Sequence, residues 1–146
     1  MKANAKTIGF ASERTQRRKH FKIDDVPIPL RRARFTGTHC WDSQKQQKMI
    51  IGLALQSQLA DEPLFEGPLD IDILFYFPIS KRLSKENQLI YKDKPHIFKP
   101  DLDNLIKMYL DCSNNILFKD DCIVSTIHAR KLYGIPRTEI IITELR

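Results

Sequence analysis

The sequence has few cysteines and no long apolar run, and these absences exclude several classes of protein. Three of its 146 residues are cysteine. This odd number, without a CxxC pair, argues against a disulfide framework and against a cysteine-based zinc site. No apolar stretch approaches the roughly 20 residues that cross a bilayer, and the basic N-terminal residues lack the apolar core of a signal peptide. We therefore expect a cytoplasmic protein without membrane contact.

Charge is present in abundance, but it is distributed unevenly. Residues 1–50 hold 12 Lys and Arg against 4 Asp and Glu, whereas residues 51–146 hold 12 against 14. A basic region beside an acidic one is typical of an enzyme that grips a polyanion and holds a cation for its chemistry. A basic segment that only aids solubility is the alternative. With 42% hydrophobic residues, the chain is long enough to bury one core.

The hydrophobic patterns predict a single α+β domain. We expect a mixed, mostly antiparallel sheet with two main helices, in the approximate order β-α-β-α-β-β. The last two strands, separated by Gly134 and Pro136, are expected to pair as an antiparallel hairpin. Residues 1–20 are interpreted as a basic N-terminal extension and residues 21–146 as the domain. The expected strands cover residues 21–26, 69–77, 123–132 and 138–145, and the expected helices residues 44–60 and 103–114.

The first predicted helix carries two local signals. Ser43 and Gln46 have the spacing of a capping box. Met49, Ile50, Leu53 and Leu59, with the small Ala54 nearby, are expected to form the buried face of this helix. Residues 80–94 are polar and charged. They are expected to form a long surface excursion with room for a short helix.

The residues suited to chemistry gather between residues 99 and 121. Asp101 and Asp103 stand at a helix start, Lys107 shares the helix face of Asp103, and Asp120-Asp121 follow the next turn, from which they can fold back toward the helix start. So many carboxylates repel one another unless a cation lies between them, and Mg²⁺ prefers such oxygen ligands. The alternative is that these aspartates only cap the helix and face water. A second pair, Asp70 and Asp72, is expected to lie on the solvated side of a strand.

The strings KPDLDNLIKMYLD, ILFKDDCIV, HARKLYG and PRTEIIITE closely resemble the RusA family of Holliday-junction resolvases, small endonucleases of bacteria and their prophages. The resemblance covers about residues 65–146. It implies homodimers that cut four-way DNA junctions in paired strands during recombination and repair, with Mg²⁺ as cofactor, although Mn²⁺ suits the same ligands. It also implies residue roles: catalytic Asp101, Asp103, Lys107 and Asp121, and metal-binding Asp101, Asp103, Asp120 and Asp121.

The N-terminal third matches this family less closely. Arg32-Ala33-Arg34-Phe35 stands where family members often have Arg-Pro-Arg-Phe. Arg31, Arg32, Arg34 and Lys99 are the candidate DNA-binding residues, because contacts to phosphates supply most non-specific affinity for DNA. Two other functions remain open: a metal-dependent nuclease of other branched or duplex DNA, and a non-catalytic protein that binds DNA junctions.

Several further side chains have an expected place rather than a role. His96 and Phe98 are expected to pack in the protein, and Cys112 to fill a small buried space. Trp41 has the chemistry to stack on unpaired bases. His128 is expected to point outward from its strand.

Overall fold

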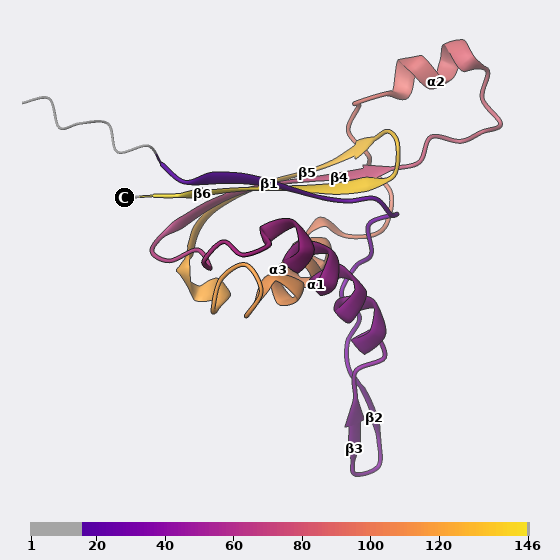
Figure 1. Cartoon of the computed structure of the whole chain (residues 1–146). Helices are drawn as coiled ribbons and strands as arrows, with labels where there is room; N and C mark the ends of the chain where they lie inside the picture. The colour runs from indigo at the N-terminus through magenta and orange to yellow at the C-terminus, as the bar shows by residue number, and fades with distance from the viewer. Residues whose placement is uncertain (1–15, 146) are drawn as a thin grey trace, which may run out of the picture.

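A four-stranded sheet has two helices on one face, and no helix within residues 16–145 covers its other face (Figure 1). The structure is a computed structural model, and it describes residues 16–145. The fold is the expected single-domain α+β arrangement. The elements in chain order are β1 (Arg18–Ile23), β2 (Arg34–Thr36), β3 (His39–Trp41), α1 (Lys45–Leu59), β4 (Leu69–Phe77), α2 (Lys85–Tyr91), α3 (Leu102–Ser113), the short 3₁₀ helix η1 (Asp121–Ile123), β5 (Val124–Tyr133) and β6 (Arg137–Glu144).

The order of strands in the sheet is β1-β6-β4-β5, so the predicted hairpin of the last two strands is wrong. Strand β4 lies between them, parallel to β5 and antiparallel to β6. The turn between β5 and β6 crosses the end of β4, where the Gly134 N–H donates to the Phe77 carbonyl at 2.9 Å. Turn residues mark where a chain reverses, but they do not determine whether a third strand is inserted between the two arms. The connection from β4 to β5 is a long crossover, as a parallel pair requires.

Alternation along β4 determines which face of the sheet is buried. Ile71, Ile73 and Phe75 point toward the helices and are buried, whereas Asp70 and Asp72 point to the other side, here called the outer face. The helices α1 and α3 pack their buried residues against the inner face, which places the hydrophobic core between sheet and helices. The crossover that contains α2 and α3 therefore brings α3 onto the inner face.

Helix α1 has the predicted bounds to within one residue, but most of the predicted buried face is wrong. Leu59 is buried as predicted, together with Ile51 and Leu55, whereas Met49, Ile50 and Leu53 are 57%, 60% and 58% exposed. Apolar residues occur on both sides of this helix, and packing against the sheet selects the side that carries Ile51, Leu55 and Leu59. The predicted capping box is absent as well, since the helix starts after Gln44 and has no side-chain cap.

The N-terminal strand begins earlier than expected. Strand β1 starts at Arg18 and pairs with β6 through residues 18–23, so the boundary drawn at residue 20 falls inside a strand. The rest of the predicted extension, residues 1–15, lies outside the described residues. On the open edge of β1, the Gln58 side chain of α1 accepts from Lys22 N at 2.8 Å and donates to Lys22 O at 2.7 Å.

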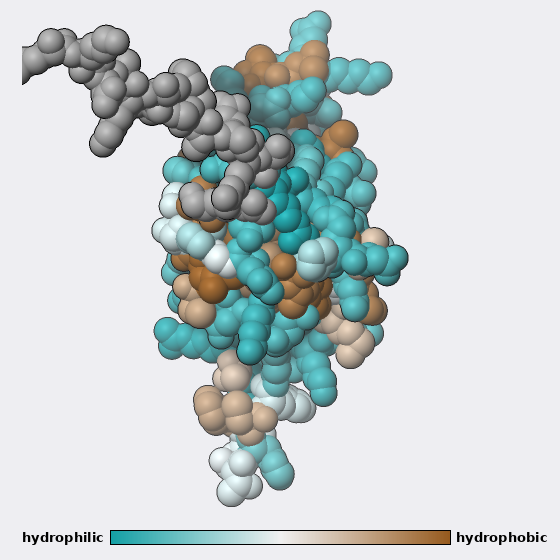
Figure 2. Space-filling view, turned by 60° about the vertical axis from the view of Figure 1, so that its left-hand side comes forward, coloured by the Kyte–Doolittle hydropathy of each residue, from teal (hydrophilic) through white to brown (hydrophobic). Residues whose placement is uncertain are grey.

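Two segments project from the body of the domain. The β2–β3 hairpin, which the sequence analysis did not predict, extends beyond α1, and the excursion with α2 extends from the opposite end (Figure 1). Both carry exposed apolar side chains, including Phe35, Trp41 and Leu89, and hydrophobic surface is visible at both ends of the molecule in Figure 2. The predicted short helix in residues 80–94 is confirmed as α2. No helix within the described residues has the length and hydrophobicity to cross a membrane.

Candidate active site

The loop before α3 positions the first aspartate of the candidate site. Asp101 occupies the N-cap position in an extended conformation, but its side chain makes no capping bond. Instead the Lys99 ammonium donates to Asp101 Oδ1 at 2.6 Å. The hydrogen bond and charge of Lys99, with a smaller effect from Lys131, lower the pKa of Asp101. This exposed carboxylate is therefore ionised at neutral pH and available to a ligand.

Lys131 of β5 holds this loop in place. Its side chain is on the inner side of the sheet, because Lys131 pairs with the buried Phe75. Its ammonium donates to the carbonyls of Phe98 at 2.6 Å and Pro100 at 2.8 Å. The start of α3 is thus tied to the sheet by two charge-assisted hydrogen bonds. Lys131 was not predicted as a site residue, although strand alternation places it on the face opposite to the outward His128. Its hydrogen bonds to the loop before α3 join segments far apart in the sequence, and no local pattern indicates them.

Helix α3 has one buried and one charged face. Leu105, Met108, Tyr109 and Cys112 are buried and form the packed face, which confirms the expected place of Cys112. The opposite face presents charged, exposed side chains at every fourth position: Asp103, Lys107 and Asp111. Asp103 and Asp111 are eight residues apart, which corresponds to a rise of about 12 Å along the helix axis.

The Asp120-Asp121 pair follows α3 and a turn anchored by the buried Phe118. Asp120 caps η1 by accepting from Cys122 N at 2.8 Å, and this hydrogen bond lowers the pKa of Asp120. The pKa of Asp121 is raised, first by burial, then by the hydrogen bond and charge of Asp120 and by the charge of Asp111. A bound cation would reverse this penalty, so the pair has the electrostatics of a cation site.

The carboxylates form two groups rather than one. Asp101 and Asp103 lie at the start of α3, whereas Asp121 interacts with Asp120 and with Asp111 of the last turn. Within residues 16–145 no three of these aspartates bring oxygens within 4.8 Å of one another. The Asp120-Asp121 pair thus lies nearer the end of α3 than its start, in contrast to the expectation that it folds back toward Asp101. The turn is set by the burial of Leu117 and Phe118, which charge spacing does not reveal.

Three of the four candidate DNA-binding residues lie just before β2 or at its first position. Arg31, Arg32 and Arg34 are exposed, as is Lys99 beside Asp101. The buried Gln44 fixes the base of this segment: its Oε1 accepts from Arg31 N at 2.7 Å and its Nε2 donates to Pro29 O at 2.8 Å. Gln44 lies in a polar run of the sequence, where no pattern indicates burial.

The aromatic residues near the site differ in their surroundings. His96 packs as expected: its ring centroid lies 4.5 Å from that of Phe77, on which it stacks, and 4.9 Å from that of the tilted Tyr133 ring. The prediction that Phe98 packs in the core is wrong, because its side chain is 65% exposed. Trp41 is also exposed, on the projecting hairpin.

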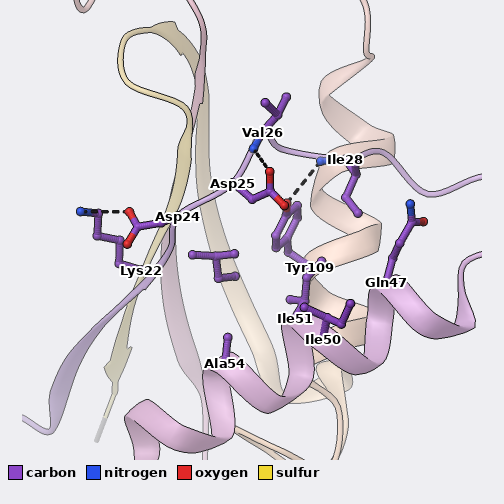
Figure 3. A pocket seen from close by; sticks show the side chains of 11 residues that line it. Lys22, Asp24, Asp25, Val26, Ile28, Gln47, Ile50, Ile51, Ala54 and Tyr109 are labelled. Atoms are coloured by element: carbon purple, nitrogen blue, oxygen red, sulfur yellow. Dashed lines mark hydrogen bonds and ion pairs between the residues drawn. The ribbon is translucent and has the colours of Figure 1, made fainter.

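A hollow of about 490 Å³ lies between the end of β1 and α1 (Figure 3). It is lined in part by Val26, Ile50 and Ala54, and at its base the Tyr109 hydroxyl accepts from Ile28 N at 3.3 Å. None of the carboxylates of the candidate site lines it, so it is not the place where the chemistry is expected.

The chain is similar to a known endodeoxyribonuclease family and to a curated bacterial protein. The family model for endodeoxyribonuclease RusA matches residues 25–143, a range that includes the basic segment, α3 and the Asp120-Asp121 pair. A curated protein of Bacillus subtilis (strain 168), "Uncharacterized protein YqaN", is 32% identical over 114 residues, which are 73% of this chain and 80% of that protein.

Proposed function

Because the chain belongs to the RusA family of endodeoxyribonucleases, whose members generally depend on a divalent metal, we propose that it resolves Holliday junctions by Mg²⁺-dependent cleavage. The reaction would serve DNA recombination and repair. The observation that carries the proposal is the charged face of α3, which presents Asp103 and Lys107 to solvent between Asp101 at one end and Asp121 near the other. Outward-facing acids would repel a phosphate backbone unless a metal mediated the contact.

The donor set fits Mg²⁺, which takes oxygen ligands and usually retains several waters. Asp101 and Asp103 would hold the ion at the start of α3. Asp120 and Asp121 would offer a second pair of carboxylates, near the end of the same helix. Mn²⁺ could replace Mg²⁺ at such ligands. Bound metal supplies an activated water and stabilises charge at the phosphorus.

The protein's own groups contribute charge and position. Lys99 keeps Asp101 ionised, and we assign Lys107 to the scissile phosphate, whose developing negative charge its ammonium would neutralise. A cation bound beside Asp121 would offset the burial and the charges of Asp120 and Asp111 that raise the pKa of Asp121.

The basic segment is suited to grip DNA. Arg31, Arg32 and Arg34 are exposed where the chain enters the β2–β3 hairpin, and Lys99 is exposed beside Asp101. Guanidinium groups bind phosphates in two-point contacts, so this segment would hold the backbone of a DNA arm while α3 faces the cleavage point.

Paired cuts in opposing strands require two active sites, and we propose that the protein acts as a homodimer. The exposed apolar residues Met49, Ile50 and Leu53 along α1 support self-association, because a contiguous apolar surface of this kind is typical of protein–protein contacts.

The decisive experiment compares a synthetic four-way junction with a matched linear duplex and a fork, with Mg²⁺ and with chelator. We expect symmetric, Mg²⁺-dependent cuts confined to the junction, from a species that sediments as a dimer. Equal cutting of all substrates would indicate a nuclease of branched or duplex DNA without junction selectivity. Tight junction binding without cleavage in Mg²⁺ or Mn²⁺ would favour a non-catalytic binding protein.

Asp103→Asn tests the site itself. The change should reduce cleavage at least 100-fold while junction binding is kept or strengthened, since a negative charge facing the phosphates is removed. Asp61→Asn is the matched control, because Asp61 is an exposed aspartate outside the site, and it should cleave at the parental rate. Parental cleavage by Asp103→Asn would remove this residue from the active site.

A further inference from the structure

A second group of metal-ligating side chains lies on the outer face of the sheet, away from α3. Asp70 and Asp72 are two residues apart on β4, so both point outward, and Asp72 pairs with His128 of the parallel strand β5. The expectation that the aspartates lie on the side of the sheet opposite the core is confirmed. They are not fully solvated, however, because both are partly buried.

The three side chains converge. One possible ligand atom from each of Asp70, Asp72 and His128 lies within 4.8 Å of the other two, and no other such group of three exists among residues 16–145. Neighbouring ligand atoms of a tetrahedral ion with bonds of 2.0–2.2 Å lie roughly 3.4 Å apart. Small rotations of the exposed imidazole would therefore suffice to bring all three atoms to one ion.

One carboxylate oxygen in the group is left without a partner. Asp70 Oδ1 is buried and accepts no hydrogen bond, which is costly for an ionisable group unless something else compensates it. No Lys or Arg of the described chain pairs with Asp70 or Asp72. Arg130 lines the hollow that opens over Asp72 and His128, yet it forms no ion pair with them.

We propose that Asp70, Asp72 and His128 form a site for a divalent transition metal, separate from the active site. Two carboxylates and an imidazole suit Mn²⁺ or Zn²⁺, whereas Mg²⁺ favours oxygen ligands alone. The ion would join β4 to β5, the two strands between which the crossover with α3 is inserted. Its role is to stabilise this pair of strands, because an ion that binds only the folded chain raises its stability.

The test uses Mn²⁺ as the probe, since sulfur ligands such as the exposed Cys40 and Cys122 bind it weakly. Bound Mn²⁺ is counted by electron paramagnetic resonance on the full chain, with excess Mg²⁺ present to occupy sites built from oxygen alone. Asp72→Asn and His128→Gln should each lose one equivalent of bound Mn²⁺, or bind it at least tenfold more weakly. They should also lose the rise in Tm that Mn²⁺ gives the parent protein.

His20→Gln is the matched control, because His20 is on the same outer face but contacts Glu139 at 3.2 Å instead of the aspartates. It should bind Mn²⁺ like the parent protein. Unchanged Mn²⁺ stoichiometry and affinity in both Asp72→Asn and His128→Gln would overturn the proposal. The outcome is independent of the nuclease assignment, because Asp103→Asn should keep this equivalent of Mn²⁺ while losing cleavage.

Discussion

At the scale of single residues, the three thiols differ in their surroundings. Cys112 is buried among the core residues of α3, and burial raises its pKa to about 12. Cys40 and Cys122 are exposed. Since the thiolate is the reactive form, a thiol reagent should label two cysteines in the folded protein and the third only after unfolding.

The measurement is a count of labelled thiols with and without denaturant. Cys112→Ser should leave the native count at two and reduce the denatured count from three to two. Rapid labelling of Cys112 in the folded protein would contradict the packing of α3 against the core.

His96 couples the packing of a single residue to pH. Burial, and to a smaller extent the charge of Lys131, lower the pKa of His96. The unfolded chain therefore takes up a proton first as the pH falls below about 6.5, the ordinary value for histidine. The stability that the neutral ring contributes is present above this pH and is lost as the pH falls toward the lowered pKa of the folded state.

The free energy of unfolding, measured with urea between pH 7.5 and 5, should decrease more steeply for the parent protein than for His96→Phe. Phenylalanine keeps an aromatic ring against Phe77 and Tyr133 but cannot be protonated. Parallel pH profiles for the two proteins would show that His96 is protonated equally in the folded and unfolded states.

At the scale of elements, α1 provides a direct comparison between its two faces. Leu55 is fully buried, whereas Leu53 is 58% exposed on the same helix. Leu55→Ala should lower the free energy of unfolding by about 2–5 kcal/mol, the usual cost of a cavity in a core. Leu53→Ala should change it by less than about 1 kcal/mol in the monomer. Urea unfolding at low protein concentration measures both, and equal losses would reverse the assignment of the two faces.

The same helix shows what sequence could and could not predict. The bounds of α1, β4 and α3 follow from hydrophobic periodicity, and the strand alternation of β4 identifies Asp70 and Asp72 as outward residues. The buried face of α1 does not follow, because apolar residues occupy both faces and tertiary packing chooses between them. The position of β4 between β5 and β6 is likewise a long-range pairing that local turn signals leave open.

The candidate site was predictable to a similar extent. The charged face formed by Asp103 and Lys107 follows from their spacing of four residues on one helix. The roles of Lys131 and Gln44 depend on hydrogen bonds between distant segments, to the loop at Pro100 and to the backbone of Arg31. No local pattern encodes such contacts.

The basic segment that leads into the β2–β3 hairpin gives a second prediction at the scale of elements. Replacing Arg32 and Arg34 with alanine should weaken binding to all DNA sequences alike and reduce the slope of log affinity against log salt by roughly 2, because two phosphate contacts are lost. Arg18→Ala, on the outer face of β1, serves as a control and should leave the slope unchanged. An unaltered slope in the double variant would place the grip on DNA elsewhere.

At the scale of the whole molecule, the two faces of the sheet have different roles. The inner face carries α1, α3 and the core, so the proposed nuclease site depends on the packing of the domain. The outer face carries the proposed second metal site on β4 and β5. Variants on the two faces should therefore separate catalysis from metal-dependent stability, as Asp103→Asn and His128→Gln are designed to do.

The excursion that contains α2 begins and ends at nearly the same place. The chain leaves the sheet after Phe77, whose carbonyl accepts from Gly134, and returns where Asp93 N donates to Tyr133 O and Tyr133 N to Lys94 O. Both ends of this excursion are hydrogen-bonded to the turn between β5 and β6. The residues between them therefore form a natural insertion point. A longer or shorter segment, or an inserted reporter domain, can be accommodated there without altering the path of the chain into α3.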